Sequence, residues 1–395
     1  MRTVPSPQSD NAAKEFARLS LQEKPLRVSF RAVAQAFRPE EFCFSLSAFM
    51  VKAVSPGVLC LLLLMAVYAT PPEPRKTLDI YFVDVEGGQA TLFVTPAGQS
   101  LLVDTGWPGF DNRDADRIVA AAKNAKLSKI DFVLLTHYHR DHTGGVPQLA
   151  ARIPIGAFLD HGENSEPGQT DTEKVWQEYL KVAAEKKTQR TTLKPGDSLP
   201  LRGVETKVIT SDGALLEQPL PGAGAANAAC KTADQPPADQ TENPRSLGTL
   251  FTFGKLRILD LGDLTSDKEM GLMCPVNKLG AMDIYIVNHH GSITSNSPLF
   301  LNGIAPRVAI MDNGAAKGGA PSSWDAVKKS PHLEDLWQLH FSNEGGAAHN
   351  VAEPFIANLS GPDTGNYLKL TAWPDGSFEV FNARTQTAKH YAPTH

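Results

Sequence analysis

The sequence predicts an α+β protein, and three observations support this fold class. Short apolar runs rich in β-branched and aromatic residues recur from about residue 78 onward, which predicts many strands. Stretches with apolar residues at helical spacing, such as 112–125 and 172–187, lie between some of them. Histidine and aspartate residues follow directly after several of these runs. We therefore expect a strand-rich domain whose functional residues lie at strand ends.

The individual elements follow from local patterns, in chain order. Apolar runs bounded by turn residues predict strands at 78–85, 90–95, 100–103, 129–135, 155–159, 204–210, 247–253, 256–261, 282–287, 308–311, 367–373 and 377–382. Helical spacing predicts helices at 112–125, 144–151, 172–187 and 322–329, with a further helix after residue 264. Pro374-Asp375-Gly376 predicts a hairpin turn between the last two strands.

The segment with the clearest chemistry is Thr136-His137-Tyr138-His139-Arg140-Asp141-His142, which follows the predicted strand 129–135. Residues i and i+2 of an extended segment point the same way, so His137 and His139 can reach one ion together. Asp141 and His142 can serve a second ion. Imidazole and carboxylate suit zinc, iron or manganese. The alternative is a solvated polar loop, but such loops seldom carry three histidines and an aspartate at this spacing.

This H-x-H-x-D-H pattern resembles the signature of the metallo-β-lactamase superfamily, and the resemblance covers residues 77–390. It implies an αββα four-layer sandwich, in which two mixed β-sheets lie face to face with helices outside. It also implies a metal site at one edge, with two divalent ions that activate a water for hydrolysis. Zinc is expected, with manganese or iron as alternatives, and Asp141 is expected to orient the water while it binds the second ion.

The resemblance implies the remaining ligands as well. Asp263 follows the predicted strand 256–261 and resembles the superfamily's bridging aspartate, although a helix N-cap or turn is the alternative. His289 is expected as the closing ligand because it resembles related His-x-Gly-[Ser/Thr] motifs, which leaves His290 behind the ligands or facing the substrate. His161 either supplies a third histidine to the first ion or is an ordinary polar residue at a strand end.

Further motifs are similar to the hydrolase domain of competence-type (ComEC-like) DNA-uptake proteins. They are His289-His290-Gly291-Ser292, Asp84-Val85-Glu86-Gly87-Gly88-Gln89 and Met311-Asp312-Asn313-Gly314. Gln89 departs from that pattern, which has an aspartate near this place. Asp104, in an Asp-x-Gly motif, is expected to fix a ligand loop through hydrogen bonds. His340 is the histidine outside these motifs that we expect nearest the cleft.

The first 76 residues are not expected to belong to this domain. Residues 58–69 form an apolar run that is shorter than the roughly 20 residues of a membrane-spanning helix. The run has the length of a signal-peptide core and follows the basic Lys52. We predict a signal peptide at 50–69, with an uncleaved anchor as the alternative, and an over-long or disordered leader at 1–49. The protein is then periplasmic or secreted, or anchored to the membrane.

Composition limits the partners. The net charge is −5, and residues 1–69 carry 8 basic and 5 acidic residues, so the remaining chain is more acidic still. Such a chain is a poor match for long nucleic acid, whose binding depends on Lys and Arg. A small molecule or a short phosphoester is expected as substrate.

Two features remain open at this point. Residues 212–245 are rich in Ala, Pro, Gly and Asn, which predicts a flexible insertion beside the cleft. Cys230 and Cys274, the cysteines outside the predicted leader and signal segment, can pair or stay separate thiols, and their spacing does not decide between these states.

The pattern as a whole predicts a metal-dependent hydrolase that acts on an ester, phosphodiester or amide-type bond. The intact His-x-His and the export signal favour a β-lactamase or lactonase type, whereas the competence-type motifs favour a nuclease-like phosphodiesterase. A non-catalytic or redox member is less favoured, because nearly all ligands are present and no flavin-binding domain follows.

Overall fold

The computed structural model describes residues 76–394. The predicted leader at 1–49 and the signal peptide or anchor at 50–69 lie outside the described residues, so both stay predictions. Within residues 76–394, no helix is both long and apolar enough to cross a membrane.

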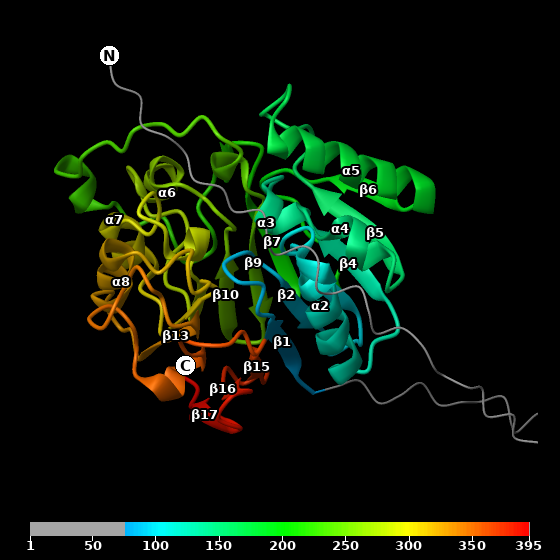
Figure 1. Ribbon diagram of the computed structural model, residues 1–395. Helices are drawn as coiled ribbons and strands as arrows, with labels where there is room; N and C mark the ends of the chain where they lie inside the picture. Colours follow the sequence, from blue (N-terminus) through cyan, green and yellow to red (C-terminus); the bar gives the residue numbers. More distant parts are fainter. Residues whose placement is uncertain (1–75, 395) are drawn as a thin grey trace, which may run out of the picture. The chain divides into compact units, whose positions relative to one another are not determined.

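The first sheet has nine strands within the described part of the chain. They are β1 (Leu78–Phe82), β2 (Thr91–Val94), β3 (Ser100–Val103), β4 (Ile130–Leu134), β5 (Ile155–Asp160), β6 (Gln189–Thr192), β15 (Leu368–Ala372), β16 (Phe378–Asn382) and β17 (Thr387–Tyr391). Their order is β17-β16-β15-β1-β2-β3-β4-β5-β6 (Figure 1). Pairing is antiparallel from β17 to β3 and parallel from β3 to β6. The sheet is therefore mixed.

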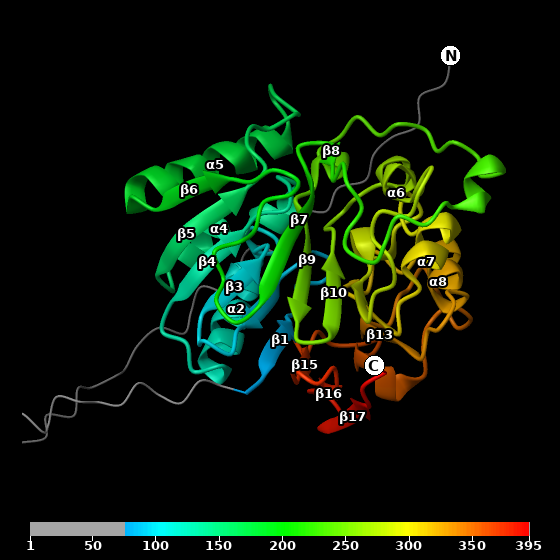
Figure 2. The same cartoon turned by 180° about the vertical axis from the view of Figure 1, so that it is seen from behind.

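The second sheet has eight strands between residues 76 and 394. They are β7 (Glu205–Ser211), β8 (Ala214–Leu215), β9 (Gly248–Phe253), β10 (Leu256–Asp260), β11 (Ile284–Ile286), β12 (Val308–Met311), β13 (Asp335–His340) and β14 (Ile356–Asn358). Their order is β14-β13-β12-β11-β10-β9-β7-β8 (Figure 2). Strands β10 to β14 pair in parallel, and the others pair antiparallel.

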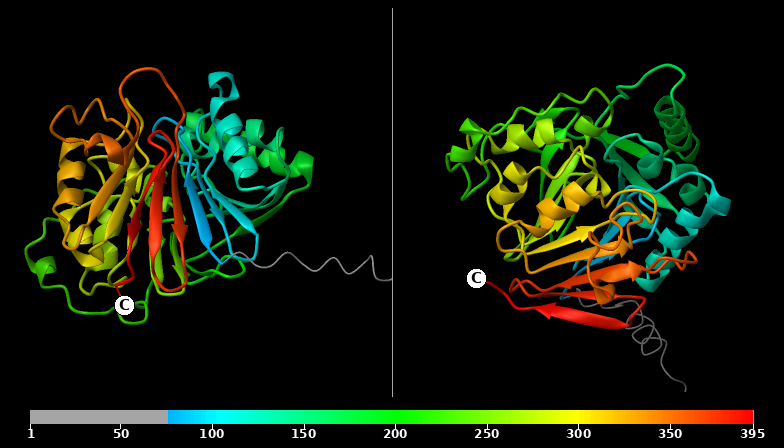
Figure 3. Two further views of the ribbon diagram at one scale, coloured as in Figure 1. Left: turned by 90° about the horizontal axis from the view of Figure 1, so that it is seen from below. Right: turned by 60° about the vertical axis from the view of Figure 1, so that its left-hand side comes forward.

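Helices cover the outer faces of both sheets, as Figure 3 shows. The α-helices are α2 (Arg113–Asn124), α3 (Arg140–Thr143), α4 (Val146–Ala150), α5 (Asp171–Lys186), α6 (Ser266–Met273), α7 (Pro298–Ile304) and α8 (Pro321–Lys328). Short 3-10 turns are η1 (Phe110–Asn112), η2 (Ala228–Lys231), η3 (Asn243–Arg245), η4 (Asn288–Gly291) and η5 (Glu353–Phe355). Helices α2, α4 and α5 pack on the first sheet, and α6, α7 and α8 on the second.

The core between the sheets is apolar on both sides. Phe93 of β2 stacks on Phe251 of β9 with ring centroids 4.3 Å apart, so the two sheets touch face to face. Strands such as β12 are buried on both faces, which explains why they read as continuous apolar runs rather than as alternating ones. The four layers are the αββα sandwich that the sequence predicts, and the fold prediction is confirmed.

This arrangement brings polar residues to one edge. The carboxyl ends of parallel strands lie at the same edge of a sheet, and open sheets of this kind bind ligands there. Strands β4, β10, β11 and β12 are parallel strands whose following loops carry the predicted ligands and Asp312. The edge of the sandwich therefore gathers residues that are more than 100 positions apart in the sequence.

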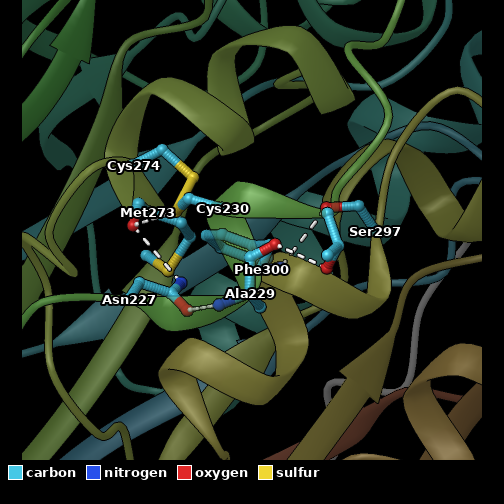
Figure 4. Close-up of a disulfide and its surroundings, with 8 residues drawn as sticks. Asn227, Ala229, Cys230, Met273, Cys274, Ser297 and Phe300 are labelled. Atoms are coloured by element: carbon cyan, nitrogen blue, oxygen red, sulfur yellow. Dashed lines mark hydrogen bonds between the residues drawn. A yellow bond between two sulfur atoms is a disulfide. The ribbon is translucent and has the colours of Figure 1, made fainter.

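The predicted insertion 212–245 is attached to the rest of the domain along residues 273–278. Cys230 and Cys274 form a disulfide (Figure 4). Asn227 donates a side-chain hydrogen bond to the Met273 carbonyl at 3.3 Å, and its backbone N–H bonds to the Pro275 carbonyl at 3.0 Å. The pairing that the sequence left open is thus present. The flexibility predicted for this segment stays a prediction.

Candidate metal centre

The loop after β4 is held in place by Asp104. This aspartate accepts hydrogen bonds from the backbone N–H of Thr136 at 2.8 Å and from its hydroxyl at 2.6 Å. It also accepts one from Nδ1 of His142 at 2.7 Å. Asp104 lies at the end of β3, next to β4, and has a positive φ of 60°. The predicted role of Asp104, fixing a ligand loop, agrees with these contacts.

One half of the centre consists of Asp141, His142, Asp263 and His290. Their ligand atoms all lie within 4.8 Å of one another, and all four residues are buried. Nε2 of His142 is 3.1 Å from Oδ2 of Asp141, 3.1 Å from Nε2 of His290 and 3.2 Å from Oδ2 of Asp263. Asp141 and His142 lie in α3, which follows β4, Asp263 follows β10, and His290 lies in η4, which follows β11.

The other half consists of His137, His139 and His289. Nε2 of His137 is 3.1 Å from Nδ1 of His139, so these two side chains point the same way, as their i, i+2 spacing suggests. Nε2 of His289 is 3.4 Å from Oδ2 of Asp263, and Nε2 of His137 is 3.8 Å from the same oxygen. Asp263 therefore contacts both halves of the centre.

The chemistry of this group fits divalent cations. Among the described residues, Oδ1 of Asp263 is buried with no hydrogen-bond partner. Burial raises the pKa of Asp263, but the histidines around it outweigh burial and hold that pKa well below its usual value. For His142 burial lowers the pKa, but Asp263, Asp141 and Asp104 together raise it well above its usual value. Buried anionic carboxylates stabilise a positive charge near them. That charge can be a proton on the facing imidazole or, in place of the proton, a metal ion.

Four histidines of the centre have a hydrogen-bond partner on their second ring nitrogen, and such partners orient metal-binding imidazoles. The pairs are His137 Nδ1 with the Thr136 hydroxyl (3.0 Å), His139 Nε2 with Glu166 (3.3 Å), His142 Nδ1 with Asp104 (2.7 Å) and His289 Nδ1 with the Thr294 hydroxyl (3.0 Å). His290 Nδ1 lies 3.3 Å from Oδ1 of Asp312 without a hydrogen bond between them.

The turn η4 lets two consecutive histidines reach the centre. His289 and His290 have φ values of 53° and 54°, a left-handed conformation that costs energy outside glycine. The turn is fixed by Asn296, whose side chain donates to the Asn288 carbonyl at 2.9 Å, and by the buried Glu269, which accepts from the Asn288 side chain at 2.9 Å. The sequence interpretation chose His289 alone. The structure brings His290 into the buried group and His289 to its border.

The structure does not bring His161 to this group. Its Nε2 lies 3.0 Å from Oε2 of Glu242, and its ring lies 4.4 Å from that of Tyr138. Glu242 is fully buried and also accepts hydrogen bonds from Ser165, so it holds the loop after β5 in place. We therefore leave His161 out of the ligand set, because its Nε2 pairs with Glu242, it contacts none of the other proposed ligands, and His289 lies beside Asp263 instead. No local pattern distinguishes Glu242 in the sequence.

His340 and Gln89 make buried contacts in the adjoining loops. Nε2 of His340 lies 2.6 Å from Asp84, which also pairs with Arg117 at 2.8 Å. Gln89 donates a hydrogen bond to Asp260 at 2.8 Å. Burial raises the pKa of Asp260 to about 7, although the Gln89 hydrogen bond opposes this. These contacts brace the loop 84–90 against the sheet edge.

A cavity of about 640 Å³ borders the His289 side of the centre. Thr294 and Ser295, which face Nδ1 of His289, contribute to its wall, and so do Thr265 and the exposed Ile293. Residues 236–239 of the insertion line it as well. The insertion thus lies beside a cavity next to the candidate metal centre.

Comparison with known proteins shows what this chain is similar to. Residues 83–222 match the family model of the metallo-beta-lactamase superfamily. This match confirms the resemblance to that superfamily. Recombination protein 2 of Haemophilus influenzae is 23% identical over 87% of this chain and 34% of its own length. Competence protein ComA of Neisseria gonorrhoeae is 25% identical over 69% of this chain and 33% of its own length. The chain spans about a third of these two relatives.

A further curated protein and two solved structures are also similar to this chain. Hydroxyacylglutathione hydrolase of Stenotrophomonas maltophilia is 36% identical over 21% of this chain and 29% of its own length. Among solved structures, the diiron β-hydroxylase CmlA of Streptomyces venezuelae covers 67% of this chain and 48% of its own, with 15% identity and a TM-score of 0.36. A diphosphatase of the PhnP family covers 72% of this chain and 83% of its own, with 15% identity and a TM-score of 0.33. The superfamily match and the hydrolase relative confirm the prediction of a metallo-β-lactamase-superfamily hydrolase. They do not identify its substrate.

Proposed function

We propose that this chain is a dinuclear metal-dependent hydrolase. The observation that carries the proposal is the position of Asp263, which contacts His137 and His289 on one side and His142 and His290 on the other. A carboxylate between two groups of imidazoles is suited to bridge two cations. A mixed nitrogen and oxygen ligand set favours zinc, and iron or manganese are the alternatives.

The ligands divide into two sets that share Asp263. His137, His139 and His289 would hold the first ion, and Asp141, His142 and His290 the second. His289 thereby takes the place that the sequence interpretation gave to His161. Each set would then have three side chains of its own, and both sets would share the Asp263 carboxylate.

When bound, two divalent ions supply Lewis acidity and lower the pKa of a water from 15.7 toward about 7. The residues of the chain place that water. Asp141 is anionic, because Lys317, His142 and His290 outweigh the effect of burial and hold its pKa well below the usual value. Its carboxylate can therefore accept a hydrogen bond from the attacking water and orient it. Buried ligands around the centre limit the entry of bulk water.

The scissile bond belongs to an ester, a phosphodiester or an amide. Two relatives carry names that concern recombination and competence. Recombination acts on DNA, whose backbone is a chain of phosphodiesters, and this supports a phosphoester substrate. The net charge of −5 argues against long nucleic acid and favours a small molecule or a short phosphoester.

We also propose that the protein is exported. The apolar run 58–69 supports this, and so does the Cys230–Cys274 disulfide, since disulfides persist in oxidising compartments. Cell fractionation that finds the full chain in the cytoplasm, with both cysteines reduced, would contradict export.

The hydrolase proposal is tested with the full-length chain, reconstituted with zinc and assayed on a chromogenic phosphodiester and a chromogenic cephalosporin. We expect hydrolysis of at least one substrate, loss of that activity with a chelator and its return with added zinc. Activity that persists after complete metal removal would contradict a metal-dependent reaction. A metal-loaded chain that cleaves neither substrate would instead support a non-catalytic metal-binding role.

A further inference from the structure

Lys317 has a position that metal binding alone does not explain. It lies in the loop between β12 and α8, and its ammonium contacts Oδ2 of Asp141. The same ammonium lies 5.2 Å from the centre of the Trp107 ring, a distance typical of a cation–π contact. The side chain is 35% exposed, so part of it faces solvent although its ammonium contacts a buried ligand residue.

The backbone of Lys317 is fixed relative to the proposed ligands. Its carbonyl accepts the N–H of Gly314 at 2.8 Å, and the N–H of Gly319 bonds to the carbonyl of His290 at 2.9 Å. Gly87 packs so closely that an added Cβ would lie 2.8 Å from the Cβ of Lys317. These contacts leave the loop little freedom to move. The backbone from which the Lys317 side chain extends therefore has a fixed position relative to the proposed ligands.

The charge balance at this point indicates what Lys317 binds. Asp141 Oδ2 belongs to the proposed second-ion site, so a bound ion and the ammonium of Lys317 compete for one carboxylate. The single negative charge of Asp141 does not balance two cationic groups this close to one another. A further anionic oxygen within reach of both the ammonium and the metal position would be stabilised there.

This charge balance also selects the type of substrate. Because Lys317 touches a ligand atom itself, the anionic oxygen must belong to the reacting group or be bonded to its central atom. A phosphodiester carries its negative charge on the phosphoryl group that reacts. A neutral ester has no such charge in the bound substrate and gains one only in its tetrahedral intermediate, and the carboxylate of a lactam lies several bonds from the amide that is cleaved.

We propose that Lys317, steadied by Trp107, binds a non-bridging oxygen of the substrate's phosphoryl group and so selects phosphoesters, an inference that rests on the proposed hydrolase function. Lys317 is thus a substrate-binding residue that determines specificity. An ammonium that donates to an anionic oxygen forms a charge-assisted hydrogen bond, which is stronger than a neutral one.

The first test compares two substrates with the same leaving group, bis(4-nitrophenyl) phosphate and 4-nitrophenyl acetate. In the zinc-loaded full chain, Lys317→Met should lower kcat/KM for the phosphodiester by about 10- to 100-fold more than for the acetate. Lys317→Arg keeps the charge and should restore part of this difference. Lys329→Met is the matched control. The Lys329 side chain is 75% exposed, and within residues 76–394 its ammonium forms an ion pair with Asp325 alone. Equal losses on both substrates would overturn the proposal.

The second test does not depend on turnover. Calorimetric titration of inorganic phosphate into the zinc-loaded chain should give a Kd that is about 10- to 100-fold weaker for Lys317→Met than for the unmodified chain, at equal zinc content. Lys317→Arg should bind phosphate more tightly than Lys317→Met. If the unmodified chain cleaves neither substrate, the hydrolase proposal fails, and the phosphate titration still decides whether the anion site exists. An unchanged phosphate Kd in Lys317→Met, or no phosphate binding to the unmodified chain, would overturn the proposal.

Discussion

Asp263→Asn is expected to remove both metal ions and to lower hydrolysis on the order of 1,000-fold or more, since the activated water depends on the ions. Asn keeps the size of the side chain but loses its negative charge. Asp263 contacts histidines of both halves of the centre, so its loss weakens both sites at once. Metal content per chain and kcat/KM of the zinc-loaded variant measure the two effects.

Asp260→Asn provides the matched control for this variant. Asp260 is also buried and lies three residues earlier, at the end of β10, where it accepts a hydrogen bond from Gln89. Burial raises the pKa of Asp260 to about 7, so a neutral side chain resembles a form that this residue already adopts. We expect Asp260→Asn to keep both ions. If Asp263→Asn also kept two ions, Asp263 would not be the bridge.

His290→Gln is expected to reduce the metal content from about two ions to about one per chain, and to lower hydrolysis by more than about 100-fold. Its imidazole lies within 3.4 Å of Asp141, His142 and Asp263. Loss of a direct ligand should exceed the 10- to 100-fold effect that removal of an outer partner typically has. Metal analysis after dialysis against a weak chelator, together with the same hydrolysis assay, measures the result.

His161→Gln separates this prediction from its alternative. His161 faces Glu242 and Tyr138 rather than the centre, so the variant should retain both ions. The opposite pattern, in which His161→Gln loses an ion and His290→Gln keeps two, would show that the superfamily's third histidine has been assigned to the wrong residue.

Much of the fold could be predicted because buried parallel strands leave a strong local signal. The strands 100–103 and 308–311 have the predicted bounds, and the strand before His137 differs by one residue at each end. The hairpin at Pro374-Asp375-Gly376 is confirmed by the antiparallel pairing of β15 with β16. The sequence missed β6 and β17, because the first is polar and the second is exposed over most of its length. It also passed over β13 and the short helix α7.

The positions of the site residues likewise depend partly on local sequence and partly on tertiary contacts. The His-x-His spacing places His137 and His139 side by side through strand geometry alone. The joint approach of His289 and His290 depends on two left-handed residues held by Glu269 and Asn296, and this tertiary effect leaves no pattern in the sequence. Lys317 was missed for the same reason. It reaches Asp141 across 176 positions of sequence.

The most direct test of the account is to locate the metal ions in crystals of the zinc-loaded full chain by anomalous scattering at the zinc edge. The account predicts two peaks on either side of Asp263. One should be bounded by His137, His139 and His289, and the other by Asp141, His142 and His290. A single peak, or a peak beside His161, would contradict the dinuclear centre proposed for this protein.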